Sequence, residues 1–149
     1  VADEAVAALD VPIQADILNL LKQLQQVMGL TFLFISHDLS VVAHTCDHVA
    51  VMYLGRLVEV APTRKLFASP RHPYTKALFS AIPSLNPEAA TKAQKLEGEI
   101  PSPSNMPVGC KFHSRCPHAI DDCRKTEPSL MPVDGDHEVA CFRWKELFA

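Results

Sequence analysis

The sequence predicts an α/β fold for its first sixty residues and a loop-rich structure for the rest. Between residues 13 and 28, apolar side chains recur every three or four positions, which is the pattern of a helix with one apolar face. The stretch Leu30–Ile35 that follows is apolar on both faces, which is typical of a buried parallel strand. Only one of the twelve prolines lies in residues 1–60, so turns and loops should concentrate in residues 61–149.

Composition sets the broad class. The chain has 149 residues, of which 48% are hydrophobic, and a net charge of −3. This length suits one domain, or a domain with a small appendage, and the apolar share excludes a disordered chain. The mild acidity argues against a protein that binds nucleic acid by neutralising phosphates. No run of 18 apolar residues is present to span a membrane.

The elements of the first part follow in order. Val1–Asp3 reads as the end of a buried strand, so we expect part of a domain to precede residue 1. A helix should begin after Asp10 as N-cap, with Pro12 in its first turn, and end at Gly29. With strand 30–35, these residues predict a βαβ unit. A short helix over 39–46 and a hairpin of strands 49–53 and 56–60, turning at Gly55, should follow.

Polar residues follow both parallel strands. Asp3 and Glu4 end the first strand, and Ser36-His37-Asp38 ends the second. Because ligands bind beyond the carboxyl ends of parallel strands, these side chains should share one edge of the sheet. There a carboxylate can hold Mg²⁺, a second can orient an attacking water, and an imidazole can contact a γ-phosphate. The alternative is that they are merely solvated strand ends.

These segments resemble motifs of ABC-transporter ATPases. Val1–Glu4 is similar to the end of a Walker B segment, Ala7-Ala8-Leu9-Asp10 to a D-loop, and Ile35–Leu39 to the switch-histidine loop. The resemblance implies catalytic roles for Glu4 and His37. It implies that Asp3 binds Mg-ATP and that Asp10 lies at the interface with a second subunit. Ala5 and Ala7 depart from the usual proline and hydroxyl residue.

The second part narrows the resemblance. Arg71–Leu78, with its His-Pro-Tyr core, resembles a segment of the ATP-binding subunits of bacterial oligopeptide and dipeptide importers. Leu96–Pro103 and Gly109–His113 resemble their C-terminal extension. The implied activity is ATP hydrolysis that powers peptide import. The implied partners are a second ATP-binding subunit, transmembrane permease subunits and, indirectly, a peptide-binding protein, with no nucleic acid.

A group of four cysteines suggests a second site. Their spacings are x5, x6 and x17 over 32 residues, and the four are Cys110, Cys116, Cys123 and Cys141. In a cytosolic protein disulfides are disfavoured, which leaves Zn²⁺ or an iron–sulfur cluster as the shared ligand. The wide spacing suits a cluster, and the resemblance to peptide-importer subunits implies [4Fe–4S], with Zn²⁺ as the alternative. Four unliganded, partly buried cysteines are the third possibility.

We therefore predict three segments. Residues 1–82 form the C-terminal part of a P-loop (ABC-type) ATPase domain, and 110–149 form a small, metal-stapled extension. Between them, 83–109 form a proline-rich connector with Pro83, Pro87, Pro101, Pro103 and Pro107. The resemblance places the protein peripherally on the cytoplasmic face of the inner membrane. The helix expected near 73–82 is a candidate docking surface.

The chain contains neither a GxxxxGK[ST] phosphate loop nor a signature motif. We therefore expect these 149 residues alone to be inactive and poorly stable, although the intact parent would hydrolyse ATP. Two other interpretations remain at this point. One is a stand-alone metal-binding interaction module without ATPase activity, and the other is a RecA-like helicase or repair ATPase.

Overall fold

The computed structural model describes residues 1–81, 96–102 and 104–148. They form two compact units, one of residues 1–47 and one that begins at His48. The second unit includes both the hairpin region and the cysteine-rich region. The segment boundaries predicted at 82/83 and 109/110 remain predictions, and Pro83, Pro87 and Pro103 of the predicted connector lie outside the described residues.

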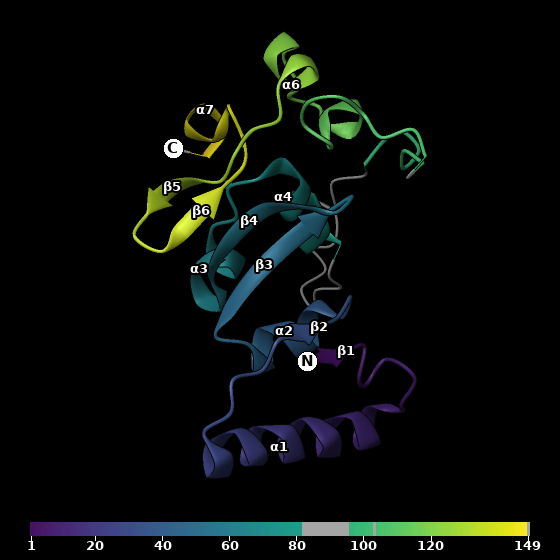
Figure 1. The fold of residues 1–149 in the computed structure, drawn as a ribbon, viewed down its shortest axis with the longest axis vertical. Coiled ribbons are helices and arrows are strands. Elements are labelled where there is room, and N and C mark those ends of the chain that lie inside the picture. The colour runs from purple at the N-terminus through teal and green to yellow at the C-terminus, as the bar shows by residue number, and fades with distance from the viewer. Residues whose placement is uncertain (82–95, 103, 149) are drawn as a thin grey trace. The chain divides into compact units, whose positions relative to one another are not determined.

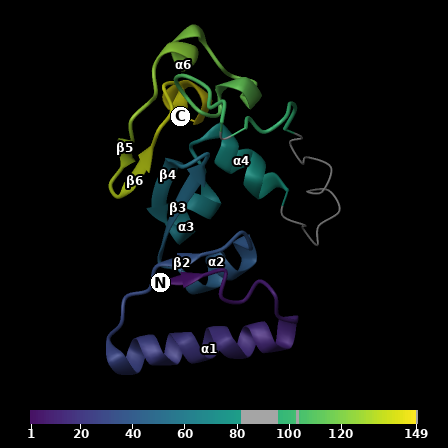
Figure 2. The same ribbon diagram turned by 45° about the vertical axis from the view of Figure 1, so that its right-hand side comes forward.

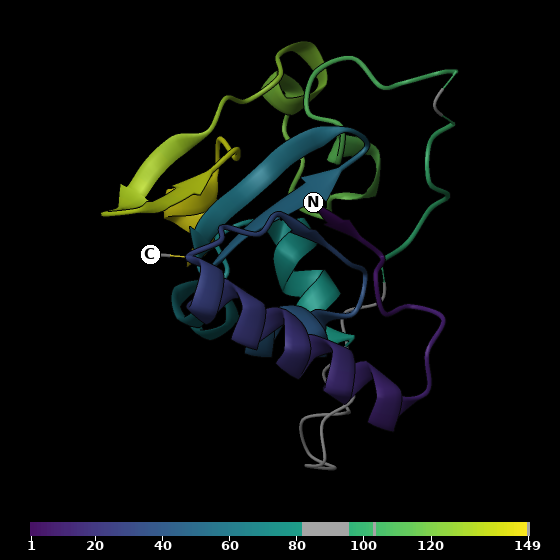
Figure 3. The ribbon, with the colours of Figure 1, turned by 60° about the horizontal axis from the view of Figure 1, so that its bottom comes forward.

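The first unit has the predicted βαβ order (Figure 3). Strand β1 (Ala2–Asp3) pairs in parallel with β2 (Phe34–Ile35), and helix α1 (Val11–Met28) lies between them in sequence. Helix α1 ends at Gly29, whose φ of 63° is left-handed, as the sequence predicted. Helix α2 (Leu39–Thr45) follows β2.

Two details of this unit differ from the sequence predictions. The second strand is two residues long instead of six, because its only described neighbour, β1, is itself two residues long. Asp10 occupies the N-cap position of α1, but within residues 1–47 its side chain makes no capping hydrogen bond. Pro12 has no N–H and so removes one of the two donors that a capping side chain normally meets.

The apolar face of α1 is present but uncovered in the part of the chain that the structure describes. No residue of the helix is buried. Ile13 and Leu20 remain 45% and 49% exposed. Among the described helices, none is long and apolar enough to cross a bilayer.

The second unit is built on a four-stranded antiparallel sheet in the order β3-β4-β6-β5 (Figure 1). Strands β3 (His48–Tyr53) and β4 (Arg56–Pro62) form the predicted hairpin. Its turn residues Leu54 and Gly55 both have positive φ, 46° and 75°, which suits the twist of a tight hairpin. Strands β5 (Met131–Asp134) and β6 (His137–Val139) extend this sheet, an arrangement that the sequence analysis did not predict.

Short helices complete the unit. Figure 2 shows α3 (Thr63–Ala68) and α4 (Pro73–Ser80) beside the hairpin. The cysteine-rich region contains a 3-10 turn, η1 (His113–Arg115), and helices α6 (Asp121–Lys125) and α7 (Trp144–Phe148). The described parts of the predicted connector, 96–102 and 104–109, contain neither helix nor strand.

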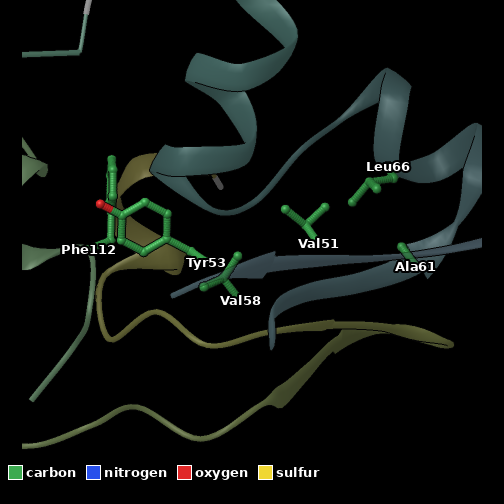
Figure 4. Close-up of a cluster of buried hydrophobic side chains, with 6 residues drawn as sticks. All are labelled: Val51, Tyr53, Val58, Ala61, Leu66 and Phe112. Atoms are coloured by element: carbon green, nitrogen blue, oxygen red, sulfur yellow. The ribbon is translucent and has the colours of Figure 1, made fainter. Parts of the chain in front are cut away.

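The core of this unit joins the hairpin to the cysteine-rich region (Figure 4). Its buried members are Val51, Tyr53, Val58, Ala61, Leu66 and Phe112. Phe112 is 1% exposed, and its ring meets that of Tyr53 edge-on at 5.3 Å. Burying an aromatic side chain contributes about 2 kcal/mol through lost water contact. The aromatic contact is therefore a main reason why residues 110–123 belong to the hairpin unit.

Helix α4 offers less surface than the sequence predicted. Pro73, Thr75 and Ala77 are buried, and Lys76 is the one exposed residue in 73–80. Of the helix that was expected to expose a docking surface over 73–82, only the edge at Lys76 is exposed within residues 73–80. Residue 82 lies outside the described residues.

His72 makes the stability of this unit sensitive to pH. The imidazole is buried, its Nδ1 accepts a hydrogen bond from the N–H of Tyr74, and desolvation lowers its pKa from 6.5 to about 4. Between pH 6.5 and pH 4 the unfolded chain binds a proton at His72 and the folded chain does not. The neutral imidazole therefore contributes its full share to the free energy of unfolding only above pH 6.5. This share is lost as pH falls toward 4, by about 3 kcal/mol.

We expect His72→Asn to flatten this dependence, because asparagine retains a cap for α4 but does not titrate. Between pH 7 and pH 4, the free energy of unfolding measured by urea titration should fall less steeply for His72→Asn than for the wild type. The difference in slope should be up to about 1.4 kcal/mol per pH unit. His44→Asn, at an exposed position, is the control. Parallel curves for His72→Asn and the wild type would contradict the assignment.

Candidate functional site

The parallel strand ends bring Glu4 and His37 together. Asp3 lies opposite Ile35 in the ladder, and the N–H of Glu4 donates to the carbonyl of Ile35 at 2.9 Å. His37 Nδ1 then lies 3.1 Å from Glu4 Oε1, although the two residues are 33 positions apart. The predicted meeting of these side chains at one edge of the sheet is therefore present.

Local hydrogen bonds orient the segment that carries His37. Ser36 Oγ accepts from the N–H of Asp38 at 3.0 Å. The Asp38 carboxylate caps α2 by accepting from the N–H groups of Ser40 and Val41, at 2.9 and 3.3 Å. His37 is thus held between the end of β2 and a capped helix, and the role of Asp38 is structural. The sequence analysis did not assign that cap.

Glu4 and His37 are exposed, with side-chain accessibilities of 58% and 74%. A contact between two exposed polar side chains adds little to stability, about 0–1 kcal/mol, so folding alone does not explain it. Glu4 has a φ of 45°, a left-handed conformation that residues with a Cβ rarely adopt. Such backbone strain is often concentrated at functional sites. Asp3 is likewise exposed at the end of β1, and Asp10 is exposed at the start of α1.

The four predicted cysteines line one cavity in the second unit. Cys110, Cys116, Cys123 and Cys141 all contribute to its wall. The cavity contains about 350 Å³ of empty space, counting the part open to solvent. None of the five cysteines, all of which lie in the described part of the chain, forms a disulfide. The sequence grouping of these four is thus also a spatial grouping.

Backbone hydrogen bonds hold the cysteine segments together. The N–H of Cys110 donates to the carbonyl of Cys123 at 2.8 Å. Turns within residues 110–119 follow, in which the N–H of His113 donates to Cys110 and that of Cys116 donates to His113. The loops that present the thiols are therefore defined by their own backbone bonds.

Burial favours the protonated form of three of these thiols. Desolvation raises the pKa of Cys110 and Cys116, and it raises that of Cys141 to about 11. Neighbouring cysteines of the same cavity add to each of these shifts. A metal that binds thiolates would have to displace these protons.

The donor set fits a thiolate-ligated group, although the thiols do not converge on one point. Within residues 1–81, 96–102 and 104–148, no three His, Cys, Asp or Glu side chains are placed to hold a single metal ion. The remainder of the wall is largely apolar and aromatic, with Phe112 and Phe142 among its members.

Sequence reasoning missed a buried polar group in this unit. Glu59 is fully buried and accepts hydrogen bonds from the backbone N–H groups of Arg71 and His72. His137 Nε2 lies 2.7 Å from Glu59 Oε1. The one available signal was a glutamate in the otherwise apolar run Leu57–Ala61, and it gave no indication of the partner.

Comparisons with known proteins show what this chain is similar to. Residues 58–123 match the family model described as the oligopeptide/dipeptide transporter C-terminal region. A Brucella ovis protein that carries the name of a peptide import ATP-binding protein is 59% identical over 96% of this chain and 45% of its own length. The dipeptide transport ATP-binding protein DppF of Haemophilus influenzae is 51% identical over 95% of this chain and 43% of its own.

A Bacillus subtilis protein named as the oligopeptide transport ATP-binding protein YkfD is 49% identical over 97% of this chain. The match covers 45% of the length of YkfD. The chain thus spans less than half the length of these curated relatives. The family model itself covers the His-Pro-Tyr segment and three of the four clustered cysteines, Cys110, Cys116 and Cys123.

Gly109 is the position where the cysteine loops tolerate no side chain. Its φ is +73°, and an added Cβ would lie 2.5 Å from the carbonyl oxygen of Cys123 and 2.8 Å from the carbonyl carbon of Arg124. We expect Gly109→Ala to lower the free energy of unfolding by about 3 kcal/mol, since backbone strain and overpacking add.

Gly55→Ala is the matched control, because Gly55 has a φ of +75° and no atom within 4 Å of the added Cβ. It should cost only about 1 kcal/mol, from the left-handed backbone alone. Urea unfolding of both variants measures the difference. Equal losses would show that the close approach at Gly109 is absent in solution.

Proposed function

We propose that this chain, which is similar to ATP-binding subunits of peptide ABC transporters, forms the carboxyl-terminal part of a motor that couples ATP hydrolysis to peptide import. The single observation that carries the proposal is the contact between Glu4 and His37 at adjacent parallel strand ends, where nucleotide chemistry is placed in such sheets. The stand-alone metal-binding module is not supported, since the relatives matched over almost the whole chain are ATP-binding subunits.

Each strand-end residue has a separate role in the proposal. Asp3, exposed at the end of β1, helps to bind the Mg²⁺ of Mg-ATP. Glu4 polarises the water that attacks the γ-phosphate, and His37 donates a hydrogen bond to that phosphate. The 3.1 Å contact between Glu4 and His37 supports this division, because the two groups are within reach of one water and one phosphate oxygen.

Further partners follow from the family. Asp10 is exposed and unused as a cap within residues 1–47, which leaves its carboxylate available to a second ATP-binding subunit. The exposed apolar face of α1 is consistent with further protein packing against it in the whole subunit. We propose a peripheral location on the cytoplasmic face of the inner membrane, through permease subunits, with a peptide-binding protein acting indirectly.

The cysteine cavity is proposed to hold a [4Fe–4S] cluster, with Zn²⁺ as the alternative. The support is the donor set of Cys110, Cys116, Cys123 and Cys141 around one cavity. Thiolates are the usual ligands of either group, so the donor set is compatible with both. When bound, such a group would link the loops that carry its ligands and so stabilise the folded module.

The catalytic assignment is tested in the whole ATP-binding subunit. We expect Glu4→Gln to lower the rate of ATP hydrolysis about 10²–10⁴-fold while leaving ATP binding intact, because the amide cannot accept a proton from water. Phosphate release and nucleotide affinity are the two measurements. Glu99→Gln, an exposed carboxylate outside this site, is the control. A Glu4→Gln subunit that turns over at the wild-type rate would refute the assigned role.

The metal assignment is tested by anaerobic purification with iron, sulfide and zinc analysis. Wild-type protein should carry about four irons and four sulfides with broad visible absorbance, and Cys110→Ser should lose both. Cys46→Ser, which removes a thiol from the first unit, should keep them. One zinc in a colourless protein would replace the cluster by a tetrathiolate zinc site. A metal-free wild type would reject both.

A further inference from the structure

We propose that Glu59 and His137 are positioning residues of the four-cysteine site, whose buried contact holds the strand leading to Cys141 in place. The metal-binding part of this inference rests on the proposed function of that site. The placement of Cys141 does not, because it concerns the chain's own fold. Neither residue lines the cavity, so both act through the segments they join.

The sheet register explains how the two side chains meet. In the β4–β6 pair, Val139 lies directly opposite Glu59. His137 is two residues earlier on the same strand, so it faces the same side of the sheet and lies diagonally across from Glu59. The histidine is 3% exposed and the glutamate fully buried, with 2.7 Å between Nε2 and Oε1. Glu59 and His137 therefore meet because β4 and β6 pair in this register.

This contact continues toward Cys141. The N–H of Ala140 donates to the carbonyl of Val58 at 2.9 Å, so strand β6 is attached to β4 up to the residue before Cys141. The position of the thiol therefore depends on the attachment of β6. A shift of one residue in this register would turn His137 away from Glu59.

The same carboxylate holds a second wall of the cavity. Glu59 Oε2 accepts from the N–H of His72 at 3.0 Å, and Oε1 accepts from the N–H of Arg71. His72 and Pro73 line the cavity with the cysteines. One buried carboxylate thus fixes both the start of α4 and the strand that leads to Cys141.

A glutamine cannot replace Glu59 here. Two backbone N–H groups donate to the carboxylate, one to each oxygen, and His137 Nε2, which donates in the tautomer that carries its proton, lies 2.7 Å from Oε1. The amide nitrogen of glutamine is a donor, so Glu59→Gln would leave at least one of these three groups unpaired in the interior. His137→Leu removes a donor instead, whereas His137→Gln retains an N–H at a similar distance from the backbone.

The test measures thiol reactivity in the full chain, reduced and metal-free. N-Ethylmaleimide modification is followed by peptide mass spectrometry, and the rate at Cys141 is divided by the rate at Cys46. We expect Glu59→Gln and His137→Leu to raise this ratio about tenfold, which corresponds to about 1.4 kcal/mol of easier local opening. His137→Gln should stay close to the wild-type ratio.

Asp136→Asn is the matched control, because Asp136 is the neighbour of His137 and joins the same hairpin to Lys65 through an exposed contact of 3.2 Å. Its ratio should equal that of the wild type. If Glu59→Gln does not fold, the pair His137→Leu and His137→Gln decides. Ratios within twofold of the wild type in folded Glu59→Gln or His137→Leu would overturn the proposal.

The same variants, reconstituted anaerobically with ferrous iron and sulfide, give the second readout. Glu59→Gln and His137→Leu should retain less iron than the wild type and Asp136→Asn. A wild type that takes up no iron would reject the cluster, but the maleimide ratios would still decide the positioning role. The two failures are therefore distinguishable.

Discussion

The buried carboxylate of Glu59 is the constraint on which the second unit depends. A buried charge is costly unless its hydrogen bonds are complete, and Glu59 completes them with groups from two distant segments. Arg71 and His72 come from the turn before α4, and His137 comes from a strand near the chain's end. These segments must be in place together, because removing either leaves an acceptor without a donor in the interior.

This constraint changes how the cysteine region is understood. The sequence suggests an appendage attached by a proline-rich connector, but its strands extend the sheet of the hairpin and Phe112 lies in the same core as Val51. The thiols of the cavity are thus presented by a framework that includes β4 and the start of α4. A group bound by the cysteines would stabilise this whole unit and not only its own loops.

The strand-end site, in contrast, is positioned mostly by interactions between residues close to its own elements. Two residue pairs of parallel ladder are enough to place Glu4 beside His37, because the N–H of Glu4 extends the ladder by one hydrogen bond. The Asp38 cap then fixes the direction in which the chain leaves the strand. Short sequence motifs can specify such a site, since each residue lies next to the element that positions it.

The sequence by itself determined the βαβ order, the end of α1 at Gly29, the hairpin at Gly55, the grouping of the cysteines and the pairing of strand-end residues. Periodicity, turn residues and spacing are local signals, and these features are local or follow from strand order. Only the tertiary structure decided the length of β2, the four-stranded sheet and the burial of Glu59 against His137. That contact joins residues 78 positions apart, and the register that creates it leaves no periodic trace in either segment.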